Sequence, residues 1–445
     1  MRGDPNPIPW RRARLPRVAI SGALAAGAWL VAPLASTAQT EAEAPPLRQT
    51  SADAYTRYEL LDPASRSFRI VYDVTATAPG ARWYFNPIRE GSEPIVHSVL
   101  DLHTGKALGW RLVDGDAARA RGLVGASPAG QYIEVTLARP VPDGGEGRIR
   151  IDKTYRDAES YRQDLDRITF SRSLGVERNA VVLPAGYELI GCNTPVQVET
   201  EADGRVKVSF IDRNPGPTPF EVVGRLLAER GSPPPATTGG AIEARPPATR
   251  SEPTSARVGW SWSERAFQDR EIVYFLQAPE THSFRLYHDY TETRPGVDRY
   301  LNVVRPGSRA SQPSARILDT GEVLEVETLR GAAIAERGID VGEPVTADTE
   351  VVAIWFAPVK PGTSVRLRIE ETYTDPGRYG LVGDELLWDR AFGRPRNTVV
   401  LPAGWLLVAS SIPGVVDLDE EGRVRLLFVN DRPDDIEVLI RARRR

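Results

Sequence analysis

The chain contains the stretch Arg178-Asn-Ala-Val-Val-Leu-Pro-Ala-Gly-Tyr187 and, 218 residues later, Arg396-Asn-Thr-Val-Val-Leu-Pro-Ala-Gly-Trp405. Eight of these ten positions are identical. Upstream, residues 63–80 align without a gap with residues 279–296, at a spacing of 216 residues. Self-similarity at a nearly constant spacing indicates a duplicated structural unit. The sequence therefore predicts two copies of one module.

The two copies define the expected domains. Repeat 1 is expected over residues 51–229 and repeat 2 over residues 259–445, and each is long enough to bury its own core. Residues 230–258 contain Ser232-Pro-Pro-Pro-Ala-Thr-Thr-Gly-Gly240 and further prolines, a composition typical of a semi-extended linker. Residues 39–50 are small, acidic and polar, so we expect them to form a flexible N-terminus of the mature chain.

Inside each copy, apolar and polar residues alternate. Arg148-Ile-Arg-Ile-Asp152 and Arg366-Leu-Arg-Ile369 have a period of two, which places one face of a strand in a core and the other in water. Residues 166–175 and 384–393 share this period, although a helix or a loop there is an alternative. The predicted fold class is all-β: two tandem homologous β-sandwich modules joined by a Pro-rich linker.

The first 38 residues have the features of a signal peptide. Four arginines between residues 11 and 17 precede an apolar run over residues 18–34, and Ser36-Thr-Ala38 offers small residues to a signal peptidase. We expect export to the periplasm or the extracellular space, cleavage near Gln39, and no membrane insertion afterwards. Retention of the segment as a membrane anchor is the alternative.

Composition and missing motifs exclude several functions. Loss of residues 1–38, which hold five Arg and one Asp, changes the formal net charge from −4 to −8, so nucleic acid is not an expected partner. The single cysteine rules out an internal disulfide and Cys-x-x-Cys sites. The sequence has no G-x-S-x-G elbow, phosphate loop or dinucleotide fingerprint, and no cofactor is expected.

A recurring order of strands runs through most of each copy. In repeat 1 it leads from Gln131-Tyr-Ile-Glu-Val-Thr-Leu137 through residues 148–155 to Val181-Val-Leu-Pro-Ala-Gly-Tyr187. This order resembles the noncatalytic N-terminal β-sandwich of M1-type aminopeptidases. The zinc-binding HExxH helix of that family is absent. The resemblance therefore implies a fold and argues against peptidase activity.

The four histidines form the pairs His97 with His103 and His282 with His288, each six residues apart. On one straight strand such a pair lies about 20 Å apart, too far to share a metal ion. His288 stands beside Asp289, and a carboxylate there is expected to tune its proton affinity. His288 and Asp289 are thus candidate ligand-binding residues, and an ordinary histidine on a strand surface is the alternative.

Two acidic triplets occupy equivalent places before a glycine: Glu199, Glu201 and Asp203, and then Asp417, Asp419 and Glu421. Their spacing is similar to the start of an EF-hand loop. The position of the bidentate Glu, however, is Phe210 in one copy and Phe428 in the other. A hairpin turn is therefore favoured, and a weak surface Ca²⁺ site is the alternative.

Trp260 and Trp262 lie in Gly259-Trp-Ser-Trp-Ser263 at the end of the linker and share a face if the chain is extended. We expect them to anchor the linker to repeat 2, or else to form a stacking platform for a sugar or peptide.

Several polar residues recur in both copies, among them Asp73 with Asp289, Arg172 with Arg390, and Arg178-Asn179 with Arg396-Asn397. We expect buried ion pairs and asparagines bonded to local backbone, because buried charges need partners.

Two classes of function remain. The favoured one is an exported noncatalytic binding or scaffold module for a protein or glycan partner. The alternative is a carboxylate-dependent extracellular hydrolase acting on glycan or peptide, which would need two carboxylates about 5 to 10 Å apart beside an aromatic platform.

Overall fold

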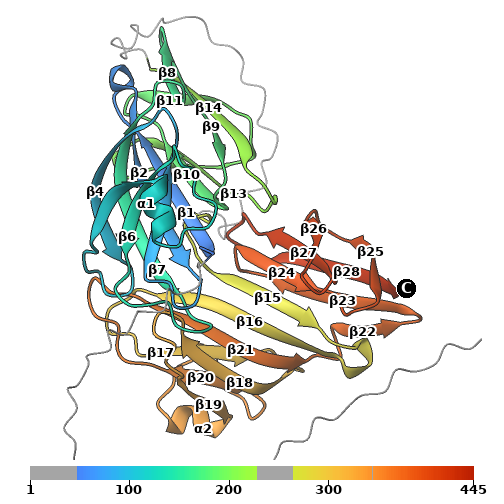
Figure 1. The fold of residues 1–445 in the computed structure, drawn as a ribbon. Coiled ribbons are helices and arrows are strands. Elements are labelled where there is room, and N and C mark those ends of the chain that lie inside the picture. Colours follow the sequence, from blue (N-terminus) through green and yellow to red (C-terminus); the bar gives the residue numbers. More distant parts are fainter. Residues whose placement is uncertain (1–47, 228–263, 343) are drawn as a thin grey trace, which may run out of the picture. The chain divides into compact units, whose positions relative to one another are not determined.

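Each repeat is built from three β-sheets and one short α-helix (Figure 1). The computed structural model describes residues 48–227, 264–342 and 344–445. The signal peptide and the linker expected from the sequence lie outside these residues. Repeat 1 comprises β1 (Ser51–Leu60), β2 (Ser67–Ala76), β3 (Trp83–Ile88), β4 (Glu93–Asp101), β5 (Trp110–Asp114), α1 (Gly115–Ala120), β6 (Gln131–Thr136), β7 (Gly147–Arg156), β8 (Tyr161–Asp164), β9 (Arg167–Leu174), β10 (Arg178–Val182), β11 (Tyr187–Cys192), β12 (Gln197–Thr200), β13 (Val206–Ile211) and β14 (Thr218–Leu226).

Repeat 2 has the same elements in the same order. They are β15 (Glu271–Leu276), β16 (Ser283–Glu292), β17 (Arg299–Val304), β18 (Arg309–Ile317), β19 (Glu325–Arg330), α2 (Ala332–Glu336), β20 (Glu350–Trp355), β21 (Val365–Thr374), β22 (Tyr379–Val382), β23 (Glu385–Phe392), β24 (Arg396–Val400), β25 (Trp405–Ser410), β26 (Val415–Leu418), β27 (Val424–Val429) and β28 (Ile436–Arg444). The expected all-β fold of two tandem β-sandwich modules is confirmed, and residues 166–175 form mainly strand β9, not a helix.

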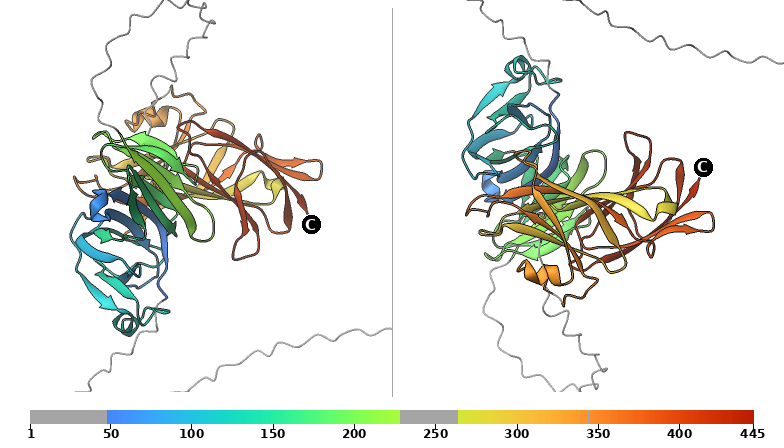
Figure 2. Two further views of the ribbon diagram at one scale, coloured as in Figure 1. Left: turned by 90° about the horizontal axis from the view of Figure 1, so that it is seen from above. Right: turned by 90° about the horizontal axis from the view of Figure 1, so that it is seen from below.

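The large sheets of the two repeats have equivalent strand orders. They run β12-β13-β10-β1-β2-β7-β4 in repeat 1 and β26-β27-β24-β15-β16-β21-β18 in repeat 2. The pairs β1 with β10 and β15 with β24 are parallel, whereas the other pairs in these sheets are antiparallel. Each repeat adds a four-stranded and a three-stranded sheet, and Figure 2 shows these layers from above and from below.

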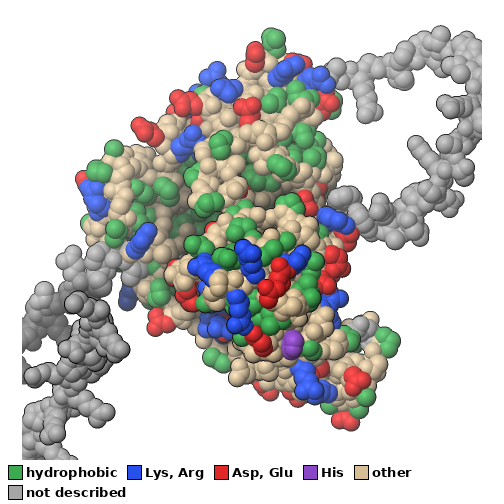
Figure 3. Space-filling model, turned by 90° about the vertical axis from the view of Figure 1, so that its right-hand side faces the viewer, with side chains coloured by type: hydrophobic (Ala, Val, Ile, Leu, Met, Phe, Trp, Pro, Cys, Tyr) green, Lys and Arg blue, Asp and Glu red, His purple; other side chains and the backbone are tan. Residues whose placement is uncertain are grey.

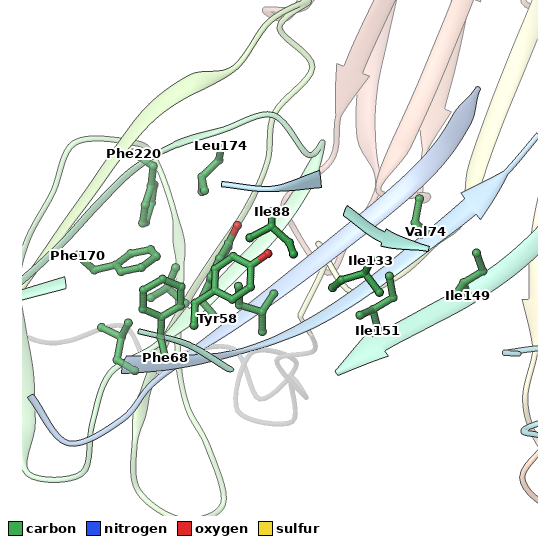
Figure 4. Close-up of a cluster of buried hydrophobic side chains, with 14 of the residues drawn as sticks. Tyr58, Phe68, Val74, Ile88, Ile133, Ile149, Ile151, Phe170, Leu174 and Phe220 are labelled. Carbon is green, nitrogen blue, oxygen red and sulfur yellow. The ribbon is translucent and has the colours of Figure 1, made fainter. Parts of the chain in front are cut away.

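The core of each repeat lies between its large sheet and the two smaller ones. In repeat 1, Phe170 of the four-stranded sheet packs against Tyr58 and Phe68 of the large sheet, with ring centroids 5.3 and 5.1 Å apart (Figure 4). Farther along the large sheet, Ile151 and neighbouring aliphatic residues pack in the same cluster as Ile133 of the three-stranded sheet (Figure 4). Alternating apolar residues therefore cover both inner faces, as the period of two predicts.

No helix among the described residues has the length and apolar character needed to cross a lipid bilayer.

Candidate functional site

His288 is buried in repeat 2, and Asp289 does not set its pKa. Its Nδ1 lies 3.3 Å from the Tyr300 hydroxyl, and its Nε2 has no hydrogen-bond partner within residues 48–227, 264–342 and 344–445. Asp289 instead accepts two hydrogen bonds from Arg368. Burial, followed by three nearby arginines, lowers the pKa of His288 well below its usual value. The expected tuning by Asp289 is wrong, because adjacent residues of a strand point to opposite faces.

The two acidic triplets lie in the hairpins β12–β13 and β26–β27. Glu199 and Glu201 each lie 3.0 Å from Lys207 Nζ, and Asp417 pairs with Arg425 at 2.6 Å. The remaining acids pair with arginines of the same hairpins, Asp203 with Arg205 and both Asp419 and Glu421 with Arg423. Protein cations thus face these carboxylates, and the described residues contain no group of three His, Cys, Asp or Glu placed to hold a metal ion.

Trp260 and Trp262 lie outside the described residues. The repeated asparagines behave as expected: Asn179 and Asn397 donate from Nδ2 to the carbonyl three residues earlier, at 2.6 and 2.7 Å. Arg178 and Arg396, which precede these asparagines, also bind groups of the other repeat.

Asp53 is a buried carboxylate shared by three arginines. Its Oδ1 lies 3.1 Å from Arg178 and 2.5 Å from Arg396, and its Oδ2 lies 2.7 Å from Arg366. A bulge in β1 between Ala52 and Tyr55, with φ of 49° at Asp53, redirects this side chain. Burial alone would raise the pKa of Asp53, but the three guanidinium groups hold it below its ordinary value. One ionised carboxylate of repeat 1 thus binds two arginines of repeat 2.

A second group of buried charges continues this junction. Arg148 binds Asp319 through Nε at 2.7 Å and Nη2 at 2.9 Å, and His103 Nδ1 lies 3.4 Å from Asp319. Glu146 lies 3.1 Å from Arg366. Burial raises the pKa of Glu146 to about 7 despite the nearby arginines, and the hydrogen bond to Asp319 raises the pKa of His103. Charged groups therefore line much of the contact between the repeats.

Contacts across the junction are reciprocal. The Glu146 amide donates to the Leu318 carbonyl at 2.9 Å. Ser364, the equivalent of Glu146, donates from its side chain to the carbonyl of Leu102, the equivalent of Leu318, at 2.7 Å. His103 and Asp319 occupy equivalent positions and contact each other. Such reciprocity is the property of an isologous interface, so the repeats meet locally as two subunits of a two-fold dimer would.

A cavity of about 530 Å³ lies at this junction and is lined by residues of both repeats. We call it the inter-repeat cavity. Its volume is in the range typical of small-ligand sites. Six arginines and four acidic residues line it, together with threonines and the aromatic rings of Tyr55, Phe267 and Tyr290. Phe267 is 55% exposed.

One wall of the inter-repeat cavity differs between the repeats. On the repeat 2 side it is formed by Arg270, Tyr290, Glu292 and Arg294, whereas the equivalent positions of repeat 1 are Ala54, Val74, Ala76 and Ala78. Repeat 1 forms the same strands with these small apolar residues. The strands that the two repeats share therefore form without these polar groups. We call these four residues of repeat 2 the polar wall.

Arg270 is the arginine of the cavity without a carboxylate partner among the described residues. Its guanidinium carbon lies 4.3 Å from the centroid of the Tyr290 ring, a cation–π contact. Tyr290 donates to Glu292 at 2.6 Å, and Arg294 binds the same carboxylate. These bonds outweigh burial and lower the pKa of Glu292 to about 2. The other arginines of the lining are paired, Arg148 with Asp319, Arg150 with Asp73, Arg178 and Arg366 with Asp53, and Arg294 with Glu292.

The motifs singled out in the sequence did not include the polar wall or Asp53. A position-by-position comparison of the repeats contains the signal: three alternate positions change from Val74, Ala76 and Ala78 to Tyr290, Glu292 and Arg294, and Ala54 changes to Arg270.

No family model and no curated protein matches the chain. Solved structures match in part. An M1 zinc metallopeptidase from Deinococcus radiodurans is 16% identical over 39% of this chain and 41% of that chain, with a TM-score of 0.27. An aminopeptidase N family protein from Idiomarina loihiensis is 10% identical over 39% of this chain and 29% of that chain, with a TM-score of 0.24. The weak resemblance expected from the sequence is thus confirmed at the level of fold alone.

Proposed function

We propose that this protein is an exported, noncatalytic binding module for a protein or glycan partner, and that the inter-repeat cavity receives a group of that partner. The polar wall carries the proposal. It places an arginine that has no ion pair among the described residues, an aromatic ring and a carboxylate where repeat 1 has alanines and a valine. Polar groups that the fold does not need, gathered at a cavity, are typical of a binding site.

The carboxylates of the cavity favour binding over hydrolysis. Acid-assisted hydrolysis of a glycoside needs a carboxyl group with a raised pKa beside a second carboxylate. Asp53 and Glu292 both have lowered pKa values, and each is held by arginine. Glu146, whose pKa is about 7, is not among the residues that line the cavity. The other two carboxylates of the lining, Asp73 and Asp269, are paired with Arg150 and Arg366.

Export is the second part of the proposal and rests on the basic, apolar and small-residue order of residues 1–38. Mass spectrometry of the protein recovered outside the cytoplasm should find an N-terminus near Gln39. Recovery with Met1 intact would contradict cleavage.

Binding can be tested with the mature protein on arrays of neutral and acidic oligosaccharides and of short peptides. We expect at least one class to bind saturably and the variant Tyr290→Val, which gives repeat 2 the residue of repeat 1, to lose that binding. Tyr287→Val, on the same strand but on the opposite face, is the matched control and should bind normally. Binding that survives in Tyr290→Val would place the site elsewhere, and release of shorter products would favour the hydrolase.

A further inference from the structure

Resting on the proposed function, we infer that the inter-repeat cavity binds a uronic acid unit of an acidic glycan, with the sugar carboxylate on Arg270. A guanidinium group offers two parallel N–H donors that match a carboxylate, and the described part of the chain gives Arg270 no such partner. The partner's carboxylate is the group that would complete this ion pair.

The charge of the surroundings favours a singly charged anion. Glu292 lines the same wall as an ionised carboxylate, and no lysine lines the cavity. The ion pairs of the other five arginines neutralise them locally. A doubly charged phosphate would be repelled by the acidic residues more strongly than a carboxylate would.

The rest of the lining suits a sugar ring better than a peptide. Phe267 offers an exposed apolar face on which the C–H groups of a sugar can stack. Thr75 and Thr293 line the cavity with hydroxyl groups that make no side-chain hydrogen bond within the described residues. These two hydroxyls can pair with the hydroxyl groups of a sugar ring. An extended peptide would instead need free strand-edge amides and carbonyls, and β2 and β16 are each paired on both sides.

The duplication predicts how many ligand units one chain binds. Because repeat 1 has Ala54 and Val74 in place of Arg270 and Tyr290, the chain contains one polar wall, not two. We therefore expect one uronate unit per chain, although the fold occurs twice.

Isothermal titration of the mature protein tests the inference with digalacturonate as probe. We expect one site per chain, and a loss of affinity of about tenfold or more in Arg270→Gln, with partial recovery in Arg270→Lys. Neutral digalactose, acetate and a tripeptide with a free carboxyl end should bind at least about tenfold more weakly. Arg156→Gln, at an exposed arginine of β7, is the control and should bind as wild type does.

The outcomes separate the inference from the proposed function. Tripeptide or acetate binding as tightly as digalacturonate would overturn the sugar assignment. Unchanged affinity in Arg270→Gln, or two sites per chain, would overturn the assigned contact. If digalacturonate does not bind while another array member binds through Tyr290, the inference fails and the proposed function stands. If no array member binds, both fail.

Discussion

Lys153 and Glu371 show how one buried position carries opposite charges in the two repeats. They occupy equivalent places in β7 and β21, and both are almost fully buried. Lys153 donates to the Asn86 side chain, and Glu371 accepts from Asn302, the equivalent of Asn86, at 2.8 Å. Burial lowers the pKa of Lys153 to about 7 and raises the pKa of Glu371. Neither charge has an ion pair among the described residues, and its burial costs stability.

The substitution Lys153→Met should stabilise the protein and alter its pH dependence. Between pH 7 and 10.5 the unfolded chain holds the Lys153 proton that the folded chain has lost. The wild type therefore gains up to about 1.4 kcal/mol per pH unit over this window as pH rises, and the variant lacks that gain. Chemical denaturation at pH 7, 8 and 9 should show that the variant's excess free energy of unfolding over the wild type decreases as pH rises. A constant difference would contradict the assignment.

Glu371→Gln is the matched control with the opposite sign. Because the folded pKa of Glu371 is raised above 4.5, its contribution is fully present below that pH and is lost as pH rises through the folded pKa. The free energy of unfolding of Glu371→Gln should therefore increase relative to that of the wild type as pH rises from 4.5 through the folded pKa of Glu371.

Among the elements, β10 and β24 are the central strands that the repeated sequence encodes. All residues of both strands are buried, and each pairs in parallel with the first strand of its repeat. Leu183 and Leu401, which follow these strands, are 0% exposed. Pro184 then ends the ladder because it has no N–H, and Gly186 adopts a φ of 81° in the turn.

Leu183→Ala and Leu401→Ala should each lower the free energy of unfolding by about 2 to 5 kcal/mol, since each leaves a cavity in a closed core. Urea denaturation measures the loss. Leu165→Ala, at a side chain that is 89% exposed, is the control and should change stability little. Wild-type unfolding of both core variants would contradict the packing.

The asparagines of the same elements should behave as structural residues. Asn179→Ala and Asn397→Ala remove a bond to backbone at a fully buried side chain and should cost about 1 to 3 kcal/mol. Thermal melting measures the cost. Normal melting combined with lost partner binding would instead identify this segment as a functional site.

At the scale of the whole molecule, the two repeats meet mainly through charges. The apolar clusters largely lie within one repeat, and the cluster that crosses the junction is small: Tyr55, Ala180 and Ala266. On the face shown in Figure 3, acidic and basic side chains lie interspersed on the surface. Exposed pairs contribute little to stability, whereas buried ones are costly to break.

Asp53→Asn should therefore destabilise the junction strongly. Removing this charge leaves three buried arginines without their shared carboxylate, a loss on the order of 3 to 5 kcal/mol. Calorimetry of the mature protein should show a lower first transition and separate unfolding of the repeats. Glu93→Gln, which breaks an exposed pair with Arg156, should leave the transitions unchanged. Identical melting of both variants would contradict the role of Asp53.

The junction should also be more stable in mild acid. The pKa of Glu146 is about 7 in the folded protein, against an ordinary value of 4.5. Its contribution to the free energy of unfolding is therefore fully present below pH 4.5 and is lost as pH rises toward 7. His103, with a raised pKa, contributes in the same direction, with its loss beginning above pH 6.5. Denaturation from pH 4.5 to 7 should show the free energy of unfolding of the wild type falling relative to that of Glu146→Gln. An unchanged slope in the variant would show that Glu146 is not the group responsible.

The sequence alone predicted the duplicated β-sandwich because its signals are local and repeated. The period of two along residues 148–155, the acidic hairpins and the Val-Val-Leu-Pro-Ala-Gly segments each report on a few neighbouring residues, and each occurs twice. The local role of Asn179 could be predicted for the same reason. These features depend on short-range geometry, which the order of residues determines directly.

Which charges meet, and where a ligand can enter, depends on how distant parts of the chain pack. Asp53, Arg366 and Arg396 are far apart in the sequence, and their pairing depends on a bulge in β1 and on how the repeats pack. His288 and Asp289 are sequence neighbours, yet the pleat separates them onto opposite faces. Local patterns carry no information about the distance between two folded surfaces. They therefore could not predict the inter-repeat cavity, or that Arg270 has no carboxylate partner in the part of the chain that the structure describes.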